Sequence, residues 1–190
     1  MSDAPKVLDG LAPDARAFNP SHSAIALAPH QITDSAHGMA YVTQVGNAEA
    51  VTLFGTTVTF LVESQRTGNA WSLLAYDAPP GFVAAAPHTH ARTTETFFVL
   101  EGTLTVRLEQ AEVEVDAFGC VVVPPRTRHT FRNAGHETVR FLALASPGGH
   151  DDFLRELLAL IAAAPAWPPA DPTPLIALAA RYDTAYDAPS

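Results

Sequence analysis

The sequence contains little cysteine and little positive charge. Its one cysteine, Cys120, cannot form an internal disulfide, and its apolar neighbours predict an inert thiol in the core. Eleven Lys and Arg residues stand against twenty Asp and Glu residues, which gives a net charge of −9. Phosphate binding needs clustered cations, so this charge balance argues against nucleic acid as a partner.

Long apolar runs are also missing. No run approaches the roughly 20 residues that a bilayer-spanning helix needs. The first ten residues, "MSDAPKVLDG", do not have the basic-then-apolar order of a signal peptide. We therefore expect a cytoplasmic protein with no membrane partner.

The 190 residues are 47% hydrophobic and include ten Phe, enough for a real core in one domain of ordinary size. The pattern divides the chain into three parts. Residues 1–37 show no sustained period and predict an irregular N-terminal arm. Residues 38–146 predict a β-barrel, and residues 147–190 predict a helical extension packed on it.

The middle part is a series of short β-type runs separated by turn residues such as "TGNA", "DAPPG" and "NAGHE". Close spacing without intervening helices predicts a mainly β, antiparallel sandwich or barrel. The nine runs are residues 40–45, 50–54, 57–63, 71–76, 94–100, 102–109, 111–115, 119–124 and 138–145.

Helical spacing begins at residue 150. The segment "HDDFLRELLALIAA" forms one apolar stripe, and Asp151 and Asp152 stand where acids favour a helix start. A proline-rich break follows, and residues 175–183 predict a second short helix. The stripe must cover something: the mouth of the barrel, the outer face of a sheet, or a dimer partner. It consists of Phe153, Leu154, Leu157, Leu158 and Ile161.

Two histidines occur one residue apart in "APHTHARTTETF". In an extended segment His88 and His90 point the same way, and Glu95 follows after a short turn. Imidazole and carboxylate are ligand types for a first-row divalent metal. A second stretch, "GCVVVPPRTRHTFRN", brings His129 on a strand that would return to the same end of the barrel.

These stretches resemble the two motifs of the cupin superfamily. The first contains Gly81, the two histidines, Glu95 and Gly102; the second contains Gly119, Pro124, His129 and Asn133. Arg126 departs from the pattern, because the family usually has glycine there. The resemblance implies a single jelly-roll cupin barrel with one divalent metal held by His88, His90, Glu95 and His129. The metal can be Ni, Fe, Mn, Co, Cu or Zn.

The flanking segments are similar to single-domain bacterial quercetin 2,3-dioxygenases. This resemblance implies cleavage of a flavonol, or a similar enolisable aromatic, with O2 and loss of carbon monoxide. Glu95 would be the catalytic base. Phe97, Val99 and Phe131 would line the substrate pocket; the alternative is that they are barrel core. We also expect a homodimer.

Two alternatives stay open. One is another metal-dependent cupin enzyme acting on a small oxygenated substrate, such as a diketone cleaver, lyase or isomerase. The other is a non-catalytic small-molecule-binding cupin. The remaining histidines have no partners at ligand spacing, so we expect them to be solvated or hydrogen-bonded rather than ligands; they are His22, His30, His37, His136 and His150.

Overall fold

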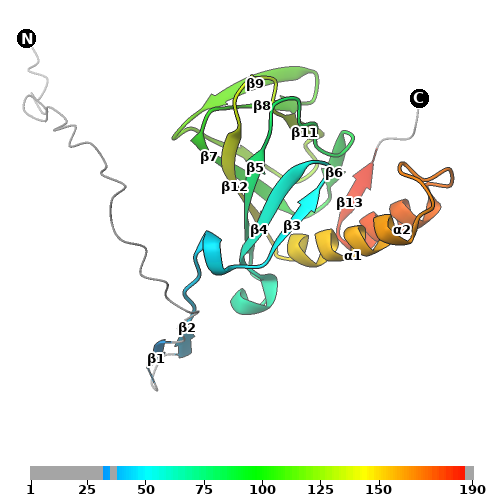
Figure 1. Ribbon diagram of the computed structural model, residues 1–190. Coiled ribbons are helices and arrows are strands. Elements are labelled where there is room, and N and C mark those ends of the chain that lie inside the picture. The colour runs from blue at the N-terminus through cyan, green and yellow to red at the C-terminus, as the bar shows by residue number, and fades with distance from the viewer. Residues whose placement is uncertain (1–31, 35–37, 187–190) are drawn as a thin grey trace, which may run out of the picture.

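The structure, a computed structural model, describes residues 32–34 and 38–186 (Figure 1). Two antiparallel sheets face each other and form a barrel of the jelly-roll type. A C-terminal pair of helices lies beside it, so the predicted mainly β fold is confirmed. The predicted N-terminal arm falls outside the described residues except for the strand β1 (Ile32–Asp34), which pairs with β2 (Gly38–Ala40).

The first sheet has six strands in the order β10-β7-β12-β5-β4-β3. Two neighbouring inner strands, β7 and β12, carry an alternating pattern of buried and exposed side chains that matches the two-residue period of a strand. The bounds of the six strands, from β10 to β3 in sheet order, are Cys120–Val123, Thr94–Glu101, Val139–Ser146, Ser72–Ala78, Thr56–Val62 and Ala50–Leu53.

The second sheet has five strands in the order β13-β6-β11-β8-β9. Gly102 has a φ of +75° in the tight turn that joins the two sheets between β7 and β8. This left-handed conformation favours glycine. The bounds in sheet order are Thr184–Tyr186, His88–His90, His129–Arg132, Thr103–Leu108 and Ala111–Asp116.

Every predicted β run except residues 40–45 contains a strand. Beyond Ala40 that run has no regular structure until the short 3₁₀ helix η1 (Val45–Asn47). No strand within the described residues pairs with positions 41–44, and β-branched residues form a strand only where a partner completes the ladder. A second 3₁₀ helix, η2 (Ser64–Thr67), follows β4.

The core between the sheets is aromatic. Phe97 and Phe131 have ring centroids 4.8 Å apart, and Tyr76 stacks on Phe141 at the same distance. Phe97 and Val99 are completely buried in this layer. Cys120, in contrast, is exposed, so the prediction that it lies in the core is wrong. It occupies the edge strand β10, where one side chain in two faces away from the core.

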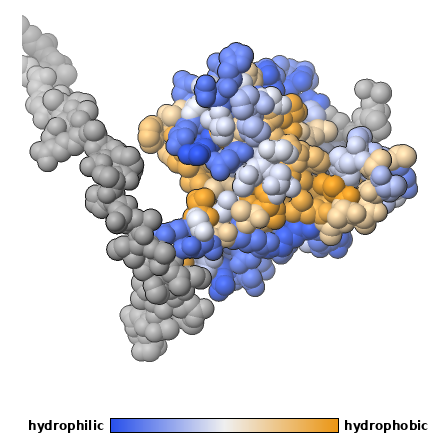
Figure 2. All heavy atoms as spheres, viewed as in Figure 1, coloured by the Kyte–Doolittle hydropathy of each residue, from blue (hydrophilic) through white to orange (hydrophobic). Residues whose placement is uncertain are grey.

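The helices α1 (His150–Ala163) and α2 (Thr173–Arg181) confirm the predicted C-terminal pair. Phe153, Leu154 and Leu157 of the predicted stripe are buried, and Leu158 and Ile161 pack beside the core. Figure 2 shows an apolar band that continues from the barrel towards the helices. None of the described helices has the length and apolar character to cross a membrane.

The second helix has the predicted length but begins and ends two residues earlier, at Thr173 and Arg181. Residues 182–183 form a turn into β13. This strand pairs with β6 and was not predicted. Its three residues are too few to show a period, and its partner lies about ninety positions earlier in the chain.

Candidate metal centre

Three strands bring the four candidate ligands together. His88 and His90 share one face of β6 because alternate residues of a strand point the same way. His129 of β11 is the direct cross-strand partner of His88. Glu95 comes from β7 in the facing sheet. The four side chains are buried, and their potential ligand atoms all lie within 4.8 Å of one another.

Each imidazole is oriented by a hydrogen bond from its Nδ1 to a backbone carbonyl. For His88 the acceptor is Ala86 O at 3.0 Å, and for His129 it is Thr127 O at 3.0 Å. For His90 it is Asp183 O at 3.2 Å. A carbonyl can only accept, so Nδ1 carries a proton, and Nε2 is the ring atom left to bind a metal or to donate a proton to a neighbouring carboxylate. This arrangement is typical of metal-binding histidines.

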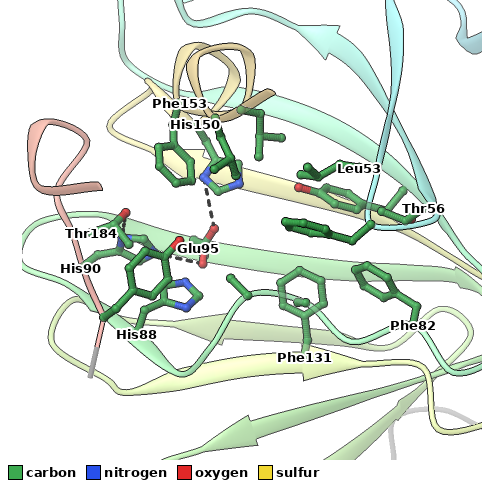
Figure 3. A pocket seen from close by; sticks show the side chains of 17 residues that line it. Leu53, Thr56, Phe82, His88, His90, Glu95, Phe131, His150, Phe153 and Thr184 are labelled. Carbon is green, nitrogen blue, oxygen red and sulfur yellow. Dashed lines mark hydrogen bonds and ion pairs between the residues drawn. The ribbon is translucent and has the colours of Figure 1, made fainter. Parts of the chain in front are cut away.

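The Nε2 atoms of two histidines face one carboxylate oxygen. Oε2 of Glu95 lies 2.7 Å from Nε2 of His129. The same oxygen lies 3.3 Å from Nε2 of His90 (Figure 3). Lone pairs and a carboxylate oxygen repel each other at such distances unless a proton or a cation lies between them. Three imidazoles and one carboxylate are the donor set for a divalent transition metal, so the residues fit such an ion.

The electrostatics of the site differ between its residues: burial lowers the pKa of His90, but its hydrogen bond to Glu95 outweighs burial and raises that pKa. Burial lowers the pKa of His88 to about 4, so its ring is neutral near pH 7. Burial raises the pKa of Glu95, but hydrogen bonds from His129 and His90 outweigh it and hold that pKa well below its usual value. A neutral imidazole and an ionised carboxylate are the forms that bind a metal.

Arg126, the departure from the family pattern, occupies the turn before His129. Its φ is +68°, in the left-handed region where glycine is favoured. Its backbone N–H donates a hydrogen bond of 2.7 Å to His90 O. The turn therefore keeps its left-handed conformation without glycine, and it ties the His129 strand to β6.

His150 is a site residue that the sequence analysis missed. It lies at the start of α1, and its Nδ1 is 3.9 Å from Oε1 of Glu95 (Figure 3). It is not one of the four candidate ligands, but it lies beside one of them. Its distance along the sequence from the candidate ligands gave no signal, because His150 belongs to α1 and not to one of the strands that carry those ligands. Burial lowers the pKa of His150, so it is neutral near pH 7.

A cavity of about 60 Å³ adjoins His88, His90 and Glu95. Its walls are mainly apolar and aromatic. Phe131 lines the cavity as predicted, whereas Phe97 and Val99 do not: they lie deeper, beneath other side chains of the barrel core. The alternation of side chains along a strand correctly predicted that Phe97 and Val99 point into the barrel. It does not predict how deeply an inward-facing side chain is buried.

The C-terminal extension closes this cavity. His150, Phe153, Leu154 and Leu157 of α1 form one wall, and Thr184 and Tyr186 of β13 contribute to it as well. The apolar stripe of α1 therefore covers the mouth of the barrel next to the candidate ligands, which is one of the three positions predicted for it. The exposed His136 lies away from the site, and His22, His30 and His37 fall outside the described residues.

The four ligands lie within a segment that matches a known family. Residues 76–145 match the family model described as "Cupin domain". The chain is 26% identical over 117 residues to quercetin 2,3-dioxygenase of Bacillus subtilis. This aligned segment covers 62% of this chain and 34% of that protein. It is 29% identical over 66 residues to the uncharacterized protein MJ1618 of Methanocaldococcus jannaschii, covering 34% and 53%.

The chain thus spans about a third to a half of the length of these curated relatives. Among solved structures, a predicted oxalate decarboxylase from Thermotoga maritima superposes with a TM-score of 0.53 at 17% identity. That superposition covers 56% of this chain and 98% of the other. At this identity the likeness establishes the fold alone.

Proposed function

Because the chain belongs to the cupin superfamily, we propose that it is a metal-dependent dioxygenase that cleaves a flavonol or a similar enolisable substrate with O2. The observation that carries the proposal is the position of Glu95. Its carboxylate borders a mainly apolar cavity and faces two imidazoles of the candidate metal centre.

His88, His90, Glu95 and His129 would hold the metal. When bound, a divalent transition metal supplies the Lewis acidity that favours an ionised enol and the electron-transfer capacity that O2 chemistry needs. Glu95 would accept the proton of the substrate hydroxyl, because a carboxylate beside the binding position can act as a general base. Cleavage of a flavonol incorporates both oxygen atoms and releases carbon monoxide.

The walls of the cavity suit an apolar, planar reactant. Phe82 and Phe131 line the part of the cavity away from Glu95 (Figure 3), and the ring of Tyr186 lies 5.8 Å from that of His88. Aromatic side chains pack well against a planar ring, and an apolar enclosure excludes water from a reactive carbanion-like intermediate. The match to quercetin 2,3-dioxygenase of Bacillus subtilis supports a flavonol as the substrate.

The cavity volume favours a second, smaller substrate class. About 60 Å³ is less than half of the roughly 150 Å³ that accommodates benzene in an engineered protein cavity. A three-ring flavonol can enter only if a wall formed by α1 or β13 moves. The enol form of a small β-diketone has a comparable acidic hydroxyl, and this smaller molecule requires a smaller displacement.

Metal analysis followed by an O2-uptake assay tests the proposal. The purified full-length chain is stripped, loaded with each of Ni, Co, Fe, Mn, Cu and Zn, and assayed with quercetin and with acetylacetone. We expect substrate-dependent O2 consumption with at least one metal, and carbon monoxide release only with quercetin. Turnover without O2 would indicate a lyase or isomerase, and tight binding without turnover would indicate a binding protein; either result rejects the dioxygenase.

A further inference from the structure

The C-terminal strand β13 lies directly beside the strand that carries two of the candidate ligands. It pairs antiparallel with β6, so that Thr184 is opposite His90 and Tyr186 is opposite His88. Figure 1 shows this last strand returning from α2 to the barrel. The end of the chain therefore completes the sheet at the metal centre, although it lies outside both sequence motifs.

Two consecutive residues of this segment contact the same nitrogen. Nδ1 of His90 lies 3.2 Å from Asp183 O and 3.3 Å from Oγ1 of Thr184. The Thr184 hydroxyl donates its own proton to Tyr182 O at 3.2 Å, so it is free to accept from His90. One N–H of His90 is thus shared between two acceptors on the C-terminal segment.

The side chain of Asp183 fixes the loop between the ligands His90 and Glu95. Its Oδ2 accepts hydrogen bonds from Arg92 N at 2.8 Å, from Thr93 N at 2.9 Å and from Oγ1 of Thr93 at 3.0 Å. Asp183 itself has a φ of +59°, which Asp tolerates better than most residues. The turn after α2 is therefore fastened to the ligand loop by both main chain and side chain.

His90 differs in this respect from the other two imidazoles. His88 and His129 each use the carbonyl two residues earlier in their own segment, Ala86 and Thr127. Those hydrogen bonds form wherever the local segment is folded. The acceptors for His90 come from more than ninety residues further along the chain, so its orientation depends on the docking of the C-terminal segment.

We propose that Asp183 and Thr184 are positioning residues of the metal centre. They set the tautomer and the ring orientation of His90 and hold the loop that leads to Glu95. The C-terminal segment thereby determines how tightly the four ligands bind a divalent metal. This role rests on the metal-binding part of the proposed function and is independent of which substrate is cleaved.

Cobalt binding by full-length variants tests this role. Thr184→Val keeps the shape of the side chain and removes the acceptor, whereas Thr184→Ser keeps the hydroxyl. Thr56→Val is the matched control, because Thr56 lines the same cavity but donates its hydroxyl to Asp77 O, away from His90. The apo proteins are stripped of metal and titrated with Co²⁺, and the visible absorption spectrum of the bound ion is recorded.

We expect Thr184→Val to weaken Co²⁺ binding about 10-fold or more and to change the spectrum, since groups that orient a ligand have effects of this size on metal affinity. Thr184→Ser and Thr56→Val should bind like the wild type. Wild-type affinity and spectrum in Thr184→Val would overturn the positioning role.

If Thr184→Val does not fold, Asp183→Asn decides, because it weakens the hold on the ligand loop while keeping the size of the side chain. A several-fold loss of Co²⁺ affinity supports the proposal, and unchanged affinity overturns it. A wild-type protein that binds no Co²⁺ would reject the metal centre itself, and with it both proposals. Wild-type binding with unaffected variants would reject the positioning role alone.

Discussion

The Nδ1 atom of His150 lies 3.9 Å from Oε1 of Glu95, while the other carboxylate oxygen of Glu95 faces the imidazoles of His90 and His129. One carboxylate thus contacts two parts of the protein: the barrel strands that carry the candidate ligands and the first residue of α1. Since His150 also lines the cavity, any substrate that reaches Glu95 contacts the extension as well.

Replacing His150 separates this contact from metal binding. His150→Leu should keep one metal per chain, because the side chain is not among the four candidate ligands. Turnover should fall about 10-fold or more, because the buried carboxylate loses a polar neighbour 3.9 Å away. The measurements are metal content and steady-state kinetics, with the exposed His136→Leu as control. Unchanged kinetics in His150→Leu would show that the contact has no role in turnover.

Removing a ligand should abolish stoichiometric metal. His129→Ala leaves a gap in the centre, and we expect metal affinity to fall by at least about 100-fold, more than the loss of an orienting group produces. Metal analysis and Co²⁺ titration measure the effect, and His136→Ala is the control for loss of an exposed histidine. A variant that still holds one metal with wild-type affinity would contradict the four-residue centre.

Glu95→Gln separates metal binding from proton transfer. The amide keeps an oxygen for the metal but cannot act as a base, so some metal should remain while turnover falls about 10²- to 10⁴-fold. The deficit should shrink as the pH rises towards the pKa of the substrate hydroxyl, where no base is needed. The pH profile of turnover checks this, with the exposed Glu101→Gln as control. Equal activity at all pH values would exclude Glu95 as the base.

The attachment of α1 to η2 gives a matched pair of stability predictions. Ser64 donates hydrogen bonds to the buried carboxylate of Asp151 from both its N–H and its hydroxyl, and its Oγ accepts from Gly149 N. Ser64→Ala should lower the free energy of unfolding by about 1–3 kcal/mol.

Ser72 is the control for this substitution. It is also fully buried, but its hydroxyl has no hydrogen-bond partner among the described residues. Ser72→Ala should therefore leave the free energy of unfolding unchanged or raise it. Urea denaturation of the apo proteins measures both, and equal losses in the two variants would contradict the predicted role of the Ser64 contacts.

Acid should weaken the C-terminal turn through Asp183. Burial raises the pKa of Asp183, but hydrogen bonds from Arg92 N and Thr93 N outweigh burial and hold it below its usual value. A carboxyl whose pKa is lower in the folded state stabilises the protein above the unfolded-state pKa of about 4. That contribution is lost as the pH falls through the folded-state pKa.

Asp183→Asn should remove this part of the pH dependence. Thermal melting of the apo protein between pH 3 and pH 7 should show a smaller loss of stability for the variant than for the wild type below about pH 4. Asp116→Asn, at an exposed residue of β9, is the control. Parallel curves for wild type and Asp183→Asn would contradict the contribution of this carboxylate.

The sequence by itself determined the barrel and the candidate ligand set. Strand propensity and turn residues are local signals, so the β-type runs at residues 94–100 and 138–145 predicted β7 and β12 correctly. The two-residue period of a strand placed His88 and His90 on one face. The spacing to Glu95 and the motif around His129 then predicted that the four residues meet, and the structure brings them together.

Tertiary structure alone decided how the site is enclosed and supported. The three residues of β13 acquire strand structure by pairing with β6, and His150 reaches Glu95 because buried side chains seat α1 at the barrel mouth. The burial depth of Phe97 and the exposure of Cys120 likewise depend on which neighbours pack against each strand. These contacts join residues tens of positions apart, and no local period or spacing encodes such a pairing.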